Sequence, residues 1–326
     1  MIRLASVAAG TRDGSLVVVG HDMKCCMRTR VPTMQAALDE WDHALPEITA
    51  CAETLEAGGG QPLDASLLAP LPRAYQYCEG STYLSHMERG RAARKAGLPP
   101  RHGAEPAVFQ GASDRFLAPT EPIRLGDVSW DLDFEATVGA IVGDVPAGVS
   151  VSEAASYIRL LVLINDLTLR AVLPREFEKG LGFVQAKPLR AFAPLAVTPD
   201  GLGADWDGLL HASVRVWLND ELVGSLDSGK DASFGFADII AYSARTRPLA
   251  AGTIVSTGTI SNTDARAGFG CLIEKRAMQT LDGLPLTRYL RPGDRVRIEA
   301  FDSSGDSIFG AIDSPVTDTT ASPKRQ

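Results

Sequence analysis

The sequence predicts an α+β fold in which strands dominate, and three observations lead to that prediction. Residues 132–145, LDFEATVGAIVGDV, alternate between apolar and other side chains with a period of two, as a strand with one apolar face does. The second half of the chain contains further apolar runs between turn signals, and helices do not alternate regularly with them. No glycine-rich phosphate-binding fingerprint is present, which excludes a doubly wound nucleotide-binding fold.

Composition narrows the function classes. At 326 residues the chain can bury a large core as one or two domains. A net charge of -8 and a pI near 5.2 argue against a surface for nucleic acid or anionic lipid. No apolar run is long enough to span a bilayer, and the start lacks the apolar core of a signal peptide, so no membrane partner is expected. Five cysteines without CxxC spacing predict reduced thiols in a cytoplasm and no zinc site.

The first 72 residues are expected to form a small mixed α/β unit. Residues 1–31 contain short strands between turn signals. Thr33 is a plausible N-cap for a helix whose apolar residues recur at helical spacing up to Leu45. Pro46 is expected to interrupt that helix or open a second one, which the glycines at 58–60 end.

A proline-rich connector follows, and we place the domain boundary at residue 72, giving domains 1–72 and 73–326. Residues 77–97 should contain a helix, capped by Ser81 or Thr82 and closed by Gly97. The other predicted elements are a helix from Val151 behind the capping box 150–153, a buried strand 160–164, a hairpin 212–226, a helix 236–245, and strands 253–257, 295–301 and 307–312.

Three acids are candidates for a shared cation site. Glu135 projects from the less apolar face of the strand at 132–145. Asp166 lies at the end of the buried strand predicted at 160–164. With Glu79 they would supply three oxygen ligands, which suit Mg²⁺ or Ca²⁺. Each acid also has a plain structural explanation: a solvent-facing strand for Glu135, a helix-start acid for Glu79 and a turn residue for Asp166.

Other polar residues could take part in chemistry. His86 lies among small polar residues and could act as a general base oriented by Glu88, or be an exposed helical histidine. Lys187 precedes a proline within an apolar segment and could hold an anionic oxygen, although a surface position is the commoner outcome. Thr259, in STGTISN, could present its hydroxyl and backbone N–H groups to a carboxylate, or simply end a strand.

From about Tyr77 to Pro315 the chain resembles bacterial members of the fumarylacetoacetate hydrolase family. The resembling segments appear in the expected order: YCEGSTYLSH, LDFEATVGAIVG, INDLTLR, QAKP, STGTISN and GDSIFGAID. The resemblance implies metal ligands at Glu79, Glu135, Thr137 and Asp166, catalytic roles for His86 and Lys187, and substrate contacts at Ser81, Gly258 and Thr259.

The resemblance also implies a fold and an activity. The fold would be a long curved mixed β-sheet folded around the active site, and the protein a homodimer. The activity would be hydrolysis of a C–C bond in a small dioxo acid such as fumarylacetoacetate or an acylpyruvate, with a divalent ion chelating the β-dicarbonyl. Alternatives are a decarboxylase or isomerase of the oxaloacetate type, or a protein that binds a small oxo acid without turnover.

Two positions depart from the family pattern. The family normally has Asp where this chain has Glu79, and Glu where it has Thr137. A threonine hydroxyl is a neutral, weak ligand, so metal affinity should be reduced, because each carboxylate–cation contact contributes several kcal/mol before desolvation. Asp133, one step along the same strand face, is a possible substitute for the missing acid.

Overall fold

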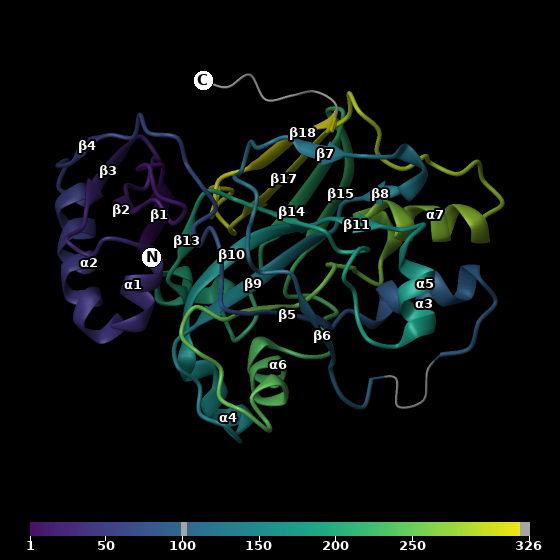
Figure 1. Ribbon diagram of the computed structural model, residues 1–326, viewed down its shortest axis with the longest axis horizontal. Helices are drawn as coiled ribbons and strands as arrows, with labels where there is room; N and C mark the ends of the chain where they lie inside the picture. Colours follow the sequence, from purple (N-terminus) through teal and green to yellow (C-terminus); the bar gives the residue numbers. More distant parts are fainter. Residues whose placement is uncertain (99–102, 320–326) are drawn as a thin grey trace.

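A mixed sheet of eleven strands runs through the molecule (Figure 1). The computed structural model describes residues 1–98 and 103–319. The strands follow the order β4, β3, β2, β1, β13, β10, β9, β16, β5 and β6, and β12 also pairs with β10. Their bounds are Arg3–Val7 (β1), Ser15–Val19 (β2), Cys25–Arg28 (β3), Gln61–Pro62 (β4), Tyr77–Ser81 (β5), Ala107–Gly111 (β6), Ala136–Val142 (β9), Ile158–Asp166 (β10), Arg190–Phe192 (β12), Ala196–Val197 (β13) and Ile254–Ser256 (β16).

A second sheet of five strands packs against the first, in the order β15, β14, β17, β18 and β7. These are Ile123–Leu125 (β7), Ser213–Leu218 (β14), Glu221–Asp227 (β15), Arg295–Phe301 (β17) and Ile312–Asp318 (β18), with a two-stranded pair of Leu132–Asp133 (β8) and Thr168–Leu169 (β11) beside them. The helices are Met34–Asp39 (α1), Trp41–Glu56 (α2), Leu84–Ala93 (α3), Val151–Ala154 (α4), Leu173–Lys179 (α5), Phe236–Ser243 (α6) and Leu272–Leu281 (α7).

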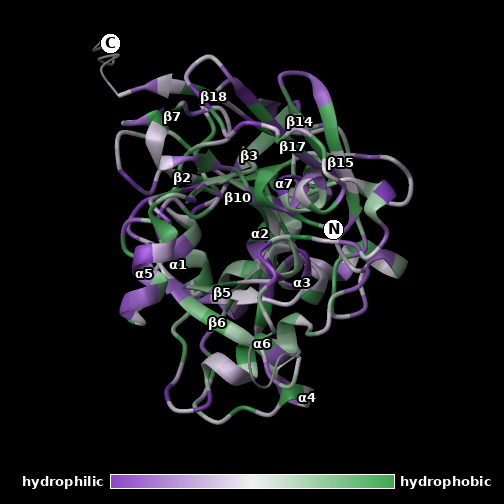
Figure 2. Ribbon diagram, turned by 90° about the vertical axis from the view of Figure 1, so that its right-hand side faces the viewer, coloured by the Kyte–Doolittle hydropathy of each residue, from purple (hydrophilic) through white to green (hydrophobic). Residues whose placement is uncertain are grey.

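The two faces of the large sheet carry different cores. On β9, Ala136, Val138 and Ala140 pack into the core shared with the five-stranded sheet, whereas Ile141 joins the core under α1 and α2. Figure 2 shows hydrophobic residues concentrated on the inner strands and hydrophilic ones on elements such as α5. Because both faces of β9 are buried, Glu135 and Thr137 lie in the interior and not on the solvent-facing strand that was one expectation.

Several predicted elements are confirmed. The side chain of Thr33 caps α1, and the capping box from Ser150 to Glu153 opens α4. The hairpin of β14 and β15 turns at Asn219 and Asp220, both with positive φ. The large sheet joins residues 1–72 to the rest of the chain through β1 and β13, and the boundary at residue 72 stays a prediction.

Other expectations were wrong. Pro46 lies inside α2, and the break between α1 and α2 falls instead at Glu40, whose backbone is not helical. α3 begins after Tyr83 without a side-chain cap, because Tyr77–Ser81 is a strand, and it ends before Gly97. The strand expected at 307–312 begins only at Ile312 (β18), and residues 132–145 are divided into β8 and β9.

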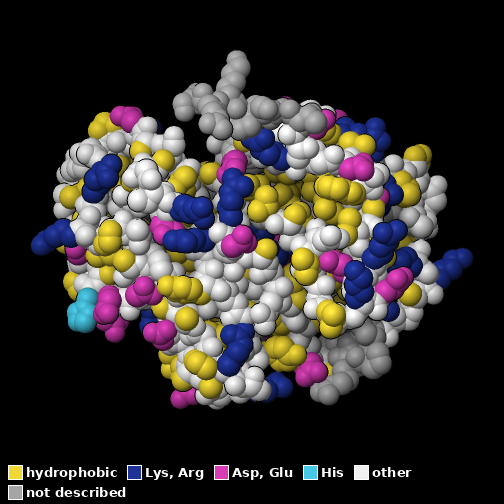
Figure 3. Space-filling model, viewed as in Figure 1, with side chains coloured by type: hydrophobic (Ala, Val, Ile, Leu, Met, Phe, Trp, Pro, Cys, Tyr) yellow, Lys and Arg dark blue, Asp and Glu magenta, His cyan; other side chains and the backbone are white. Residues whose placement is uncertain are grey.

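Basic and acidic side chains are mixed on the surface. On the face in Figure 3, basic and acidic side chains of the described residues are interspersed and do not gather by sign. Among these residues no helix is both long and apolar enough to cross a membrane. All five cysteines are free thiols.

Candidate active site

Strand register carries the candidate site residues to one face of the large sheet. Asp166 donates its backbone N–H to the carbonyl of Glu135 at 2.9 Å and pairs with Arg190 of β12. Ser256 of β16 pairs both with β9 and, at Glu79, with β5. Residues directly opposite one another in neighbouring strands project to the same side. Acids that are 87 residues apart in sequence therefore meet over one patch of sheet.

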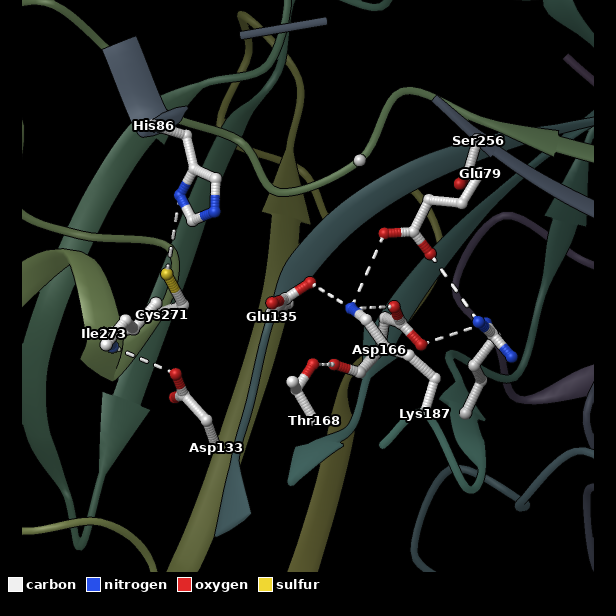
Figure 4. A network of polar contacts seen from close by, with 12 residues as sticks. Glu79, His86, Asp133, Glu135, Asp166, Thr168, Lys187, Ser256, Cys271 and Ile273 are labelled. Carbon is white, nitrogen blue, oxygen red and sulfur yellow. Dashed lines mark hydrogen bonds and ion pairs between the residues drawn. The ribbon is translucent and has the colours of Figure 1, made fainter. Parts of the chain in front are cut away.

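The three predicted acids converge in the interior. Carboxylate oxygens of Glu79, Glu135 and Asp166 lie within 4.8 Å of one another, and all three residues are buried. Lys187 reaches between them from the loop before β12 (Figure 4). Its Nζ lies 2.7 Å from Glu135 Oε2, 2.5 Å from Asp166 Oδ2 and 3.8 Å from Glu79 Oε1.

We call Glu79, Glu135 and Asp166 the acid cluster. Two arginines lie next to it. Arg170 lies 2.5 Å from Glu135 Oε1, and Arg190 Nε lies 3.0 Å from Asp166 Oδ1. Burial raises the pKa of Glu135, but Lys187 and Arg170 outweigh burial and hold it well below its usual range. Burial and the charge of Asp166 raise the pKa of Glu79 well above its usual range. Within the acid cluster, the pKa of Glu135 is therefore lowered and that of Glu79 is raised.

Asp133 has a structural role and is not a substitute metal ligand. Its carboxylate accepts hydrogen bonds from the backbone N–H groups of Leu272 and Ile273 at 2.8 and 2.9 Å. It thereby satisfies the N-terminus of α7, where negative charge is favourable. It also binds Arg170 Nε at 2.9 Å, which fixes that side chain beside Glu135. Both oxygens of the Asp133 carboxylate therefore already accept hydrogen bonds.

The residues present fit a divalent cation. Three buried carboxylates supply the hard oxygen ligands that Mg²⁺, Ca²⁺ or Mn²⁺ prefer. Thr137 projects to the same face, and its buried Oγ1 has no hydrogen-bond partner. Buried hydroxyls are normally hydrogen-bonded, so an unpaired one on the sheet face that carries the three carboxylates indicates a further group in the site.

A second cluster lies across Glu135 from Lys187 and contains His86 (Figure 4). His86 Nδ1 lies 3.2 Å from Glu274 Oε2, and Glu274 Oε1 accepts hydrogen bonds from Arg89 and Ser261. Burial raises the pKa of Glu274, but His86, Ser261 and Arg89 outweigh burial and lower it. Glu274 therefore remains ionised and can hold the ring in one orientation, with Nε2 turned toward the acid cluster.

The carboxylate that contacts His86 is thus Glu274 of α7. The expectation that Glu88, which lies with His86 on α3, orients the ring was wrong. Spacing along one helix suggested Glu88, whereas α3 and α7 pack together and bring Glu274 to the ring from 188 residues away. Cys271 Sγ lies 3.8 Å from the same nitrogen. Because Arg89 already neutralises Glu274, this group suits a histidine–carboxylate pair better than a second cation.

The segments predicted to hold the substrate border β5. Gly258 has φ +80°, and a Cβ there would lie 2.1 Å from the carbonyl oxygen of Gly80, so only glycine fits this turn. Thr259 follows it and is buried, and Ser81 at the end of β5 is half-buried. The structure brings these residues alongside Glu79.

Sequence reasoning missed Arg170, Arg190 and Glu274. Arg170 and Arg190 carry a weak signal, because each is a charged residue within a predominantly apolar run, where a solvent-exposed position is not expected. Glu274 carries no such signal, because Lys275 and Arg276 follow it directly. Arg190 is fully buried, and Glu274 is 1% exposed. Their partners could not be named, because each pairing joins segments that meet only through the sheet and the packing of α3 on α7.

Comparison with known families covers nearly the whole described chain. The family model described as fumarylacetoacetate (FAA) hydrolase C-terminal matches residues 76–317, and that described as fumarylacetoacetase N-terminal domain 2 matches residues 2–73. Human oxaloacetate tautomerase FAHD1, mitochondrial, is 28% identical over 205 residues, 58% of this chain and 83% of that protein. A 2,4-didehydro-3-deoxy-L-rhamnonate hydrolase of Sphingomonas sp. (strain SKA58) is 28% identical over 158 residues, 48% of this chain and 53% of that protein.

Solved structures share the fold across the whole length. Maleylpyruvate hydrolase from Sphingobium sp. SYK-6, in complex with manganese (II) ion and pyruvate, has a TM-score of 0.66 at 18% identity, covering 97% of this chain and 99% of that one. A 5-carboxymethyl-2-hydroxymuconate delta-isomerase from Mycobacterium smegmatis has a TM-score of 0.63 at 18% identity, with the same coverage. With both family models matched in chain order, this protein belongs to the fumarylacetoacetate hydrolase family.

Proposed function

We propose that this protein is a divalent-metal-dependent enzyme that hydrolyses a C–C bond in a small dioxo acid of the acylpyruvate or fumarylacetoacetate type. The observation that carries the proposal is the placement of the His86–Glu274 pair across from the acid cluster. The acid cluster can hold a cation and a chelating anion, and the His86–Glu274 pair can move a proton. Relatives named as hydrolases, isomerases and tautomerases of small acids support enzyme status without selecting among these reactions.

Glu79, Glu135 and Asp166 would hold the ion, with the Thr137 hydroxyl as a neutral contact. The ion, when bound, would polarise the two oxygens of a β-dicarbonyl and stabilise an enolate. Lys187 adds a fixed positive charge beside the place where enolate charge develops, and such preorganised charge is usually a large part of catalysis. Ser81, Gly258 and Thr259 are proposed to contact the substrate carboxylate through a hydroxyl and backbone N–H groups.

His86 is proposed as the general base. With Nδ1 held by Glu274, Nε2 is free to take a proton from water. The water oxygen then bonds to the carbonyl carbon distant from the substrate carboxylate, and the C–C bond breaks with its electron pair moving into the enolate. The imidazolium returns its proton to the enolate carbon, so that an acylpyruvate yields pyruvate and a second carboxylic acid, and fumarylacetoacetate yields acetoacetate and fumarate.

Tautomerisation of oxaloacetate is the second candidate. Relatives with that name include the human protein described above and oxaloacetate tautomerase YisK of Bacillus subtilis (strain 168), which is 24% identical over 247 residues. Moving a proton between carbon and oxygen needs the same enolate stabilisation and the same base, but no attacking water. The geometry of the pair and the cluster serves both reactions.

Parallel assays distinguish these functions. Fumarylacetoacetate, an acylpyruvate and oxaloacetate are each supplied with Mg²⁺, Mn²⁺ or Ca²⁺, and the products are quantified. Cleavage of a dioxo acid that stops on adding a chelator supports the hydrolase. Keto–enol interconversion of oxaloacetate without cleavage of any substrate would show that the protein is a tautomerase and not a hydrolase. Calorimetric binding of these acids without turnover of any of them would make the protein a binding module. The homodimer implied by the family is a further proposal, tested by sedimentation equilibrium.

A further inference from the structure

Arg190 occupies a site shaped for its guanidinium group behind the acid cluster. The side chain is fully buried, lies 3.9 Å from the centre of the Tyr77 ring, and donates from Nη1 to the carbonyl of Ala112 at 3.0 Å. A Cβ at Gly111 would lie only 2.4 Å from Arg190 Nη2, so glycine leaves the space that the guanidinium fills. The group is therefore held in place from three sides.

From this position Arg190 faces two of the three acids. Nε lies 3.0 Å from Asp166 Oδ1 and Nη2 lies 3.7 Å from Glu79 Oε2. Neither contact has hydrogen-bond geometry, so both nitrogens and Asp166 Oδ1 remain without hydrogen-bond partners. The contact is thus chiefly between charges, and a guanidinium cannot lose its proton in a protein. Glu79 and Asp166 face this positive charge under all conditions.

The charges of the site nearly cancel without any added ion. Three carboxylates face Lys187, Arg170 and Arg190, and Arg170 is shared with Asp133. Thr137, on the same face, adds no charge. A dication that enters alone gains little from such a cluster and is repelled by fixed cations within contact distance of its ligands. A dication chelated by an oxo acid carries less positive charge and meets less repulsion.

We propose that Arg190 sets the metal affinity of this site, making divalent-ion binding weak alone and strong only together with a chelating oxo acid. The inference rests on the proposed function in taking the acid cluster as the metal site. Coupling between two ligands is reciprocal, so the ion must strengthen binding of the acid by the same factor. The chain then has no resident metal and assembles its active centre from protein, ion and substrate.

Calorimetric titration with Mg²⁺, alone and with saturating oxalate as a non-reacting chelating acid, tests this directly. In the wild type, oxalate should tighten Mg²⁺ binding at least tenfold. Arg190→Gln should tighten binding of Mg²⁺ alone at least tenfold and lose most of the oxalate effect. Arg190→Lys keeps a positive charge and should therefore keep the binding of Mg²⁺ alone weak. Arg3→Gln removes another buried guanidinium, on β1, and should change neither affinity.

Unchanged Mg²⁺ affinity in a folded Arg190→Gln protein overturns the proposal. If Arg190→Gln does not fold, Thr137→Glu gives the second test, because it adds the opposite charge to the same face. It should tighten binding of Mg²⁺ alone at least tenfold, and no change there equally overturns the charge argument. These titrations do not depend on turnover. An inactive wild type with the predicted binding would therefore contradict the proposed function and leave the role of Arg190 standing.

Discussion

The two buried polar clusters of the site satisfy their atoms in different ways. At the acid cluster and the residues around it, Thr137 Oγ1, Asp166 Oδ1 and two nitrogens of Arg190 have no hydrogen-bond partner, although all are buried. In the other cluster, both oxygens of Glu274 are hydrogen-bonded, one to His86 and one to Arg89 and Ser261. Unpaired buried groups are costly and persist where another group completes them. The acid cluster is therefore built to receive a ligand, and the His86–Glu274 pair to hold one ring.

The largest expected effect comes from removing charge in the acid cluster. Glu135→Gln and Asp166→Asn nearly keep the shape, but each removes one of the carboxylates that Lys187 and an arginine face. One carboxylate fewer and one unbalanced cation should weaken Mg²⁺ binding in the presence of oxalate at least 100-fold, about 2.7 kcal/mol. Metal-dependent turnover should disappear. Calorimetry and steady-state assays measure the two effects.

Circular dichroism must show that both variants fold, since a lost fold would imitate a lost site. A folded variant with near-normal metal affinity would remove that acid from the cation site. Asp133→Asn is less informative, because Asp133 holds the start of α7 and its loss disturbs Glu274 as well.

His86→Ala should reduce the chemical rate by about 10²–10⁴, the usual contribution of a positioned acid–base group. Metal affinity should remain within about twofold of wild type, because His86 contacts Glu274 and Cys271 and none of the three acids. His43→Ala, on the exposed face of α2, is the matched control and should change neither quantity. Wild-type turnover in His86→Ala would exclude His86 as the general base and with it the proposed water-activation step.

Glu274→Gln should have a smaller effect, about 10- to 100-fold on turnover, because it disorders the base without removing it. Its pH dependence is diagnostic. Since the folded state lowers the pKa of Glu274, this carboxylate stabilises the protein above its ordinary pKa, and that stability is lost as pH falls through the lowered value. The variant should therefore lose less stability than wild type during acid titration, as followed by chemical denaturation. An equally steep loss of stability at low pH would show that ionised Glu274 does not stabilise the folded state.

An acid outside both clusters should affect stability alone. Burial would raise the pKa of Asp294, but Arg288, Asn219 and the N–H of Arg291 outweigh burial and lower it from 3.8 to about 2. This carboxylate then contributes at most about 2 kcal/mol at neutral pH, since Arg288 is half-exposed and screened. That contribution is complete above about pH 4 and is lost as pH falls through about 2. Asp294→Asn should lower the unfolding free energy by that amount and leave turnover unchanged.

Local pattern predicted much of the fold. The strand around Val138, the cap at Thr33 and the hairpin at Asn219 depend on neighbours within a few residues, and all three are present. Pro46 was misjudged because packing under the N-terminal strands holds α2 together through a residue that local propensity disfavours. α5 was missed because a helix of seven residues is too short to show a periodic pattern. α7 was missed although its ten residues are amphipathic.

In the candidate site, too, local sequence predicted some residues, whereas their partners depend on contacts between distant segments. Glu79, Glu135 and Asp166 were grouped correctly as neighbours, because each is an acid at an apolar strand and the family resemblance supplied the order. The cations that neutralise them could not be matched to partners, because charge pairing across a sheet depends on register. Glu274 was hidden for a related reason: its contact with His86 arises where α3 packs on α7, and neither sequence alone specifies that packing.

Proton exchange at the methyl carbon of pyruvate tests the central claim most directly. Both proposed reactions require the His86–Glu274 pair to move a proton to or from an enolate held at the acid cluster. Pyruvate is incubated in D₂O with the protein and Mg²⁺, and loss of the methyl proton signal is followed by NMR. The account predicts saturable exchange that needs Mg²⁺ and falls to the buffer rate in His86→Ala and in Glu135→Gln. Exchange at the buffer rate in wild-type protein that demonstrably binds Mg²⁺ and pyruvate would contradict it.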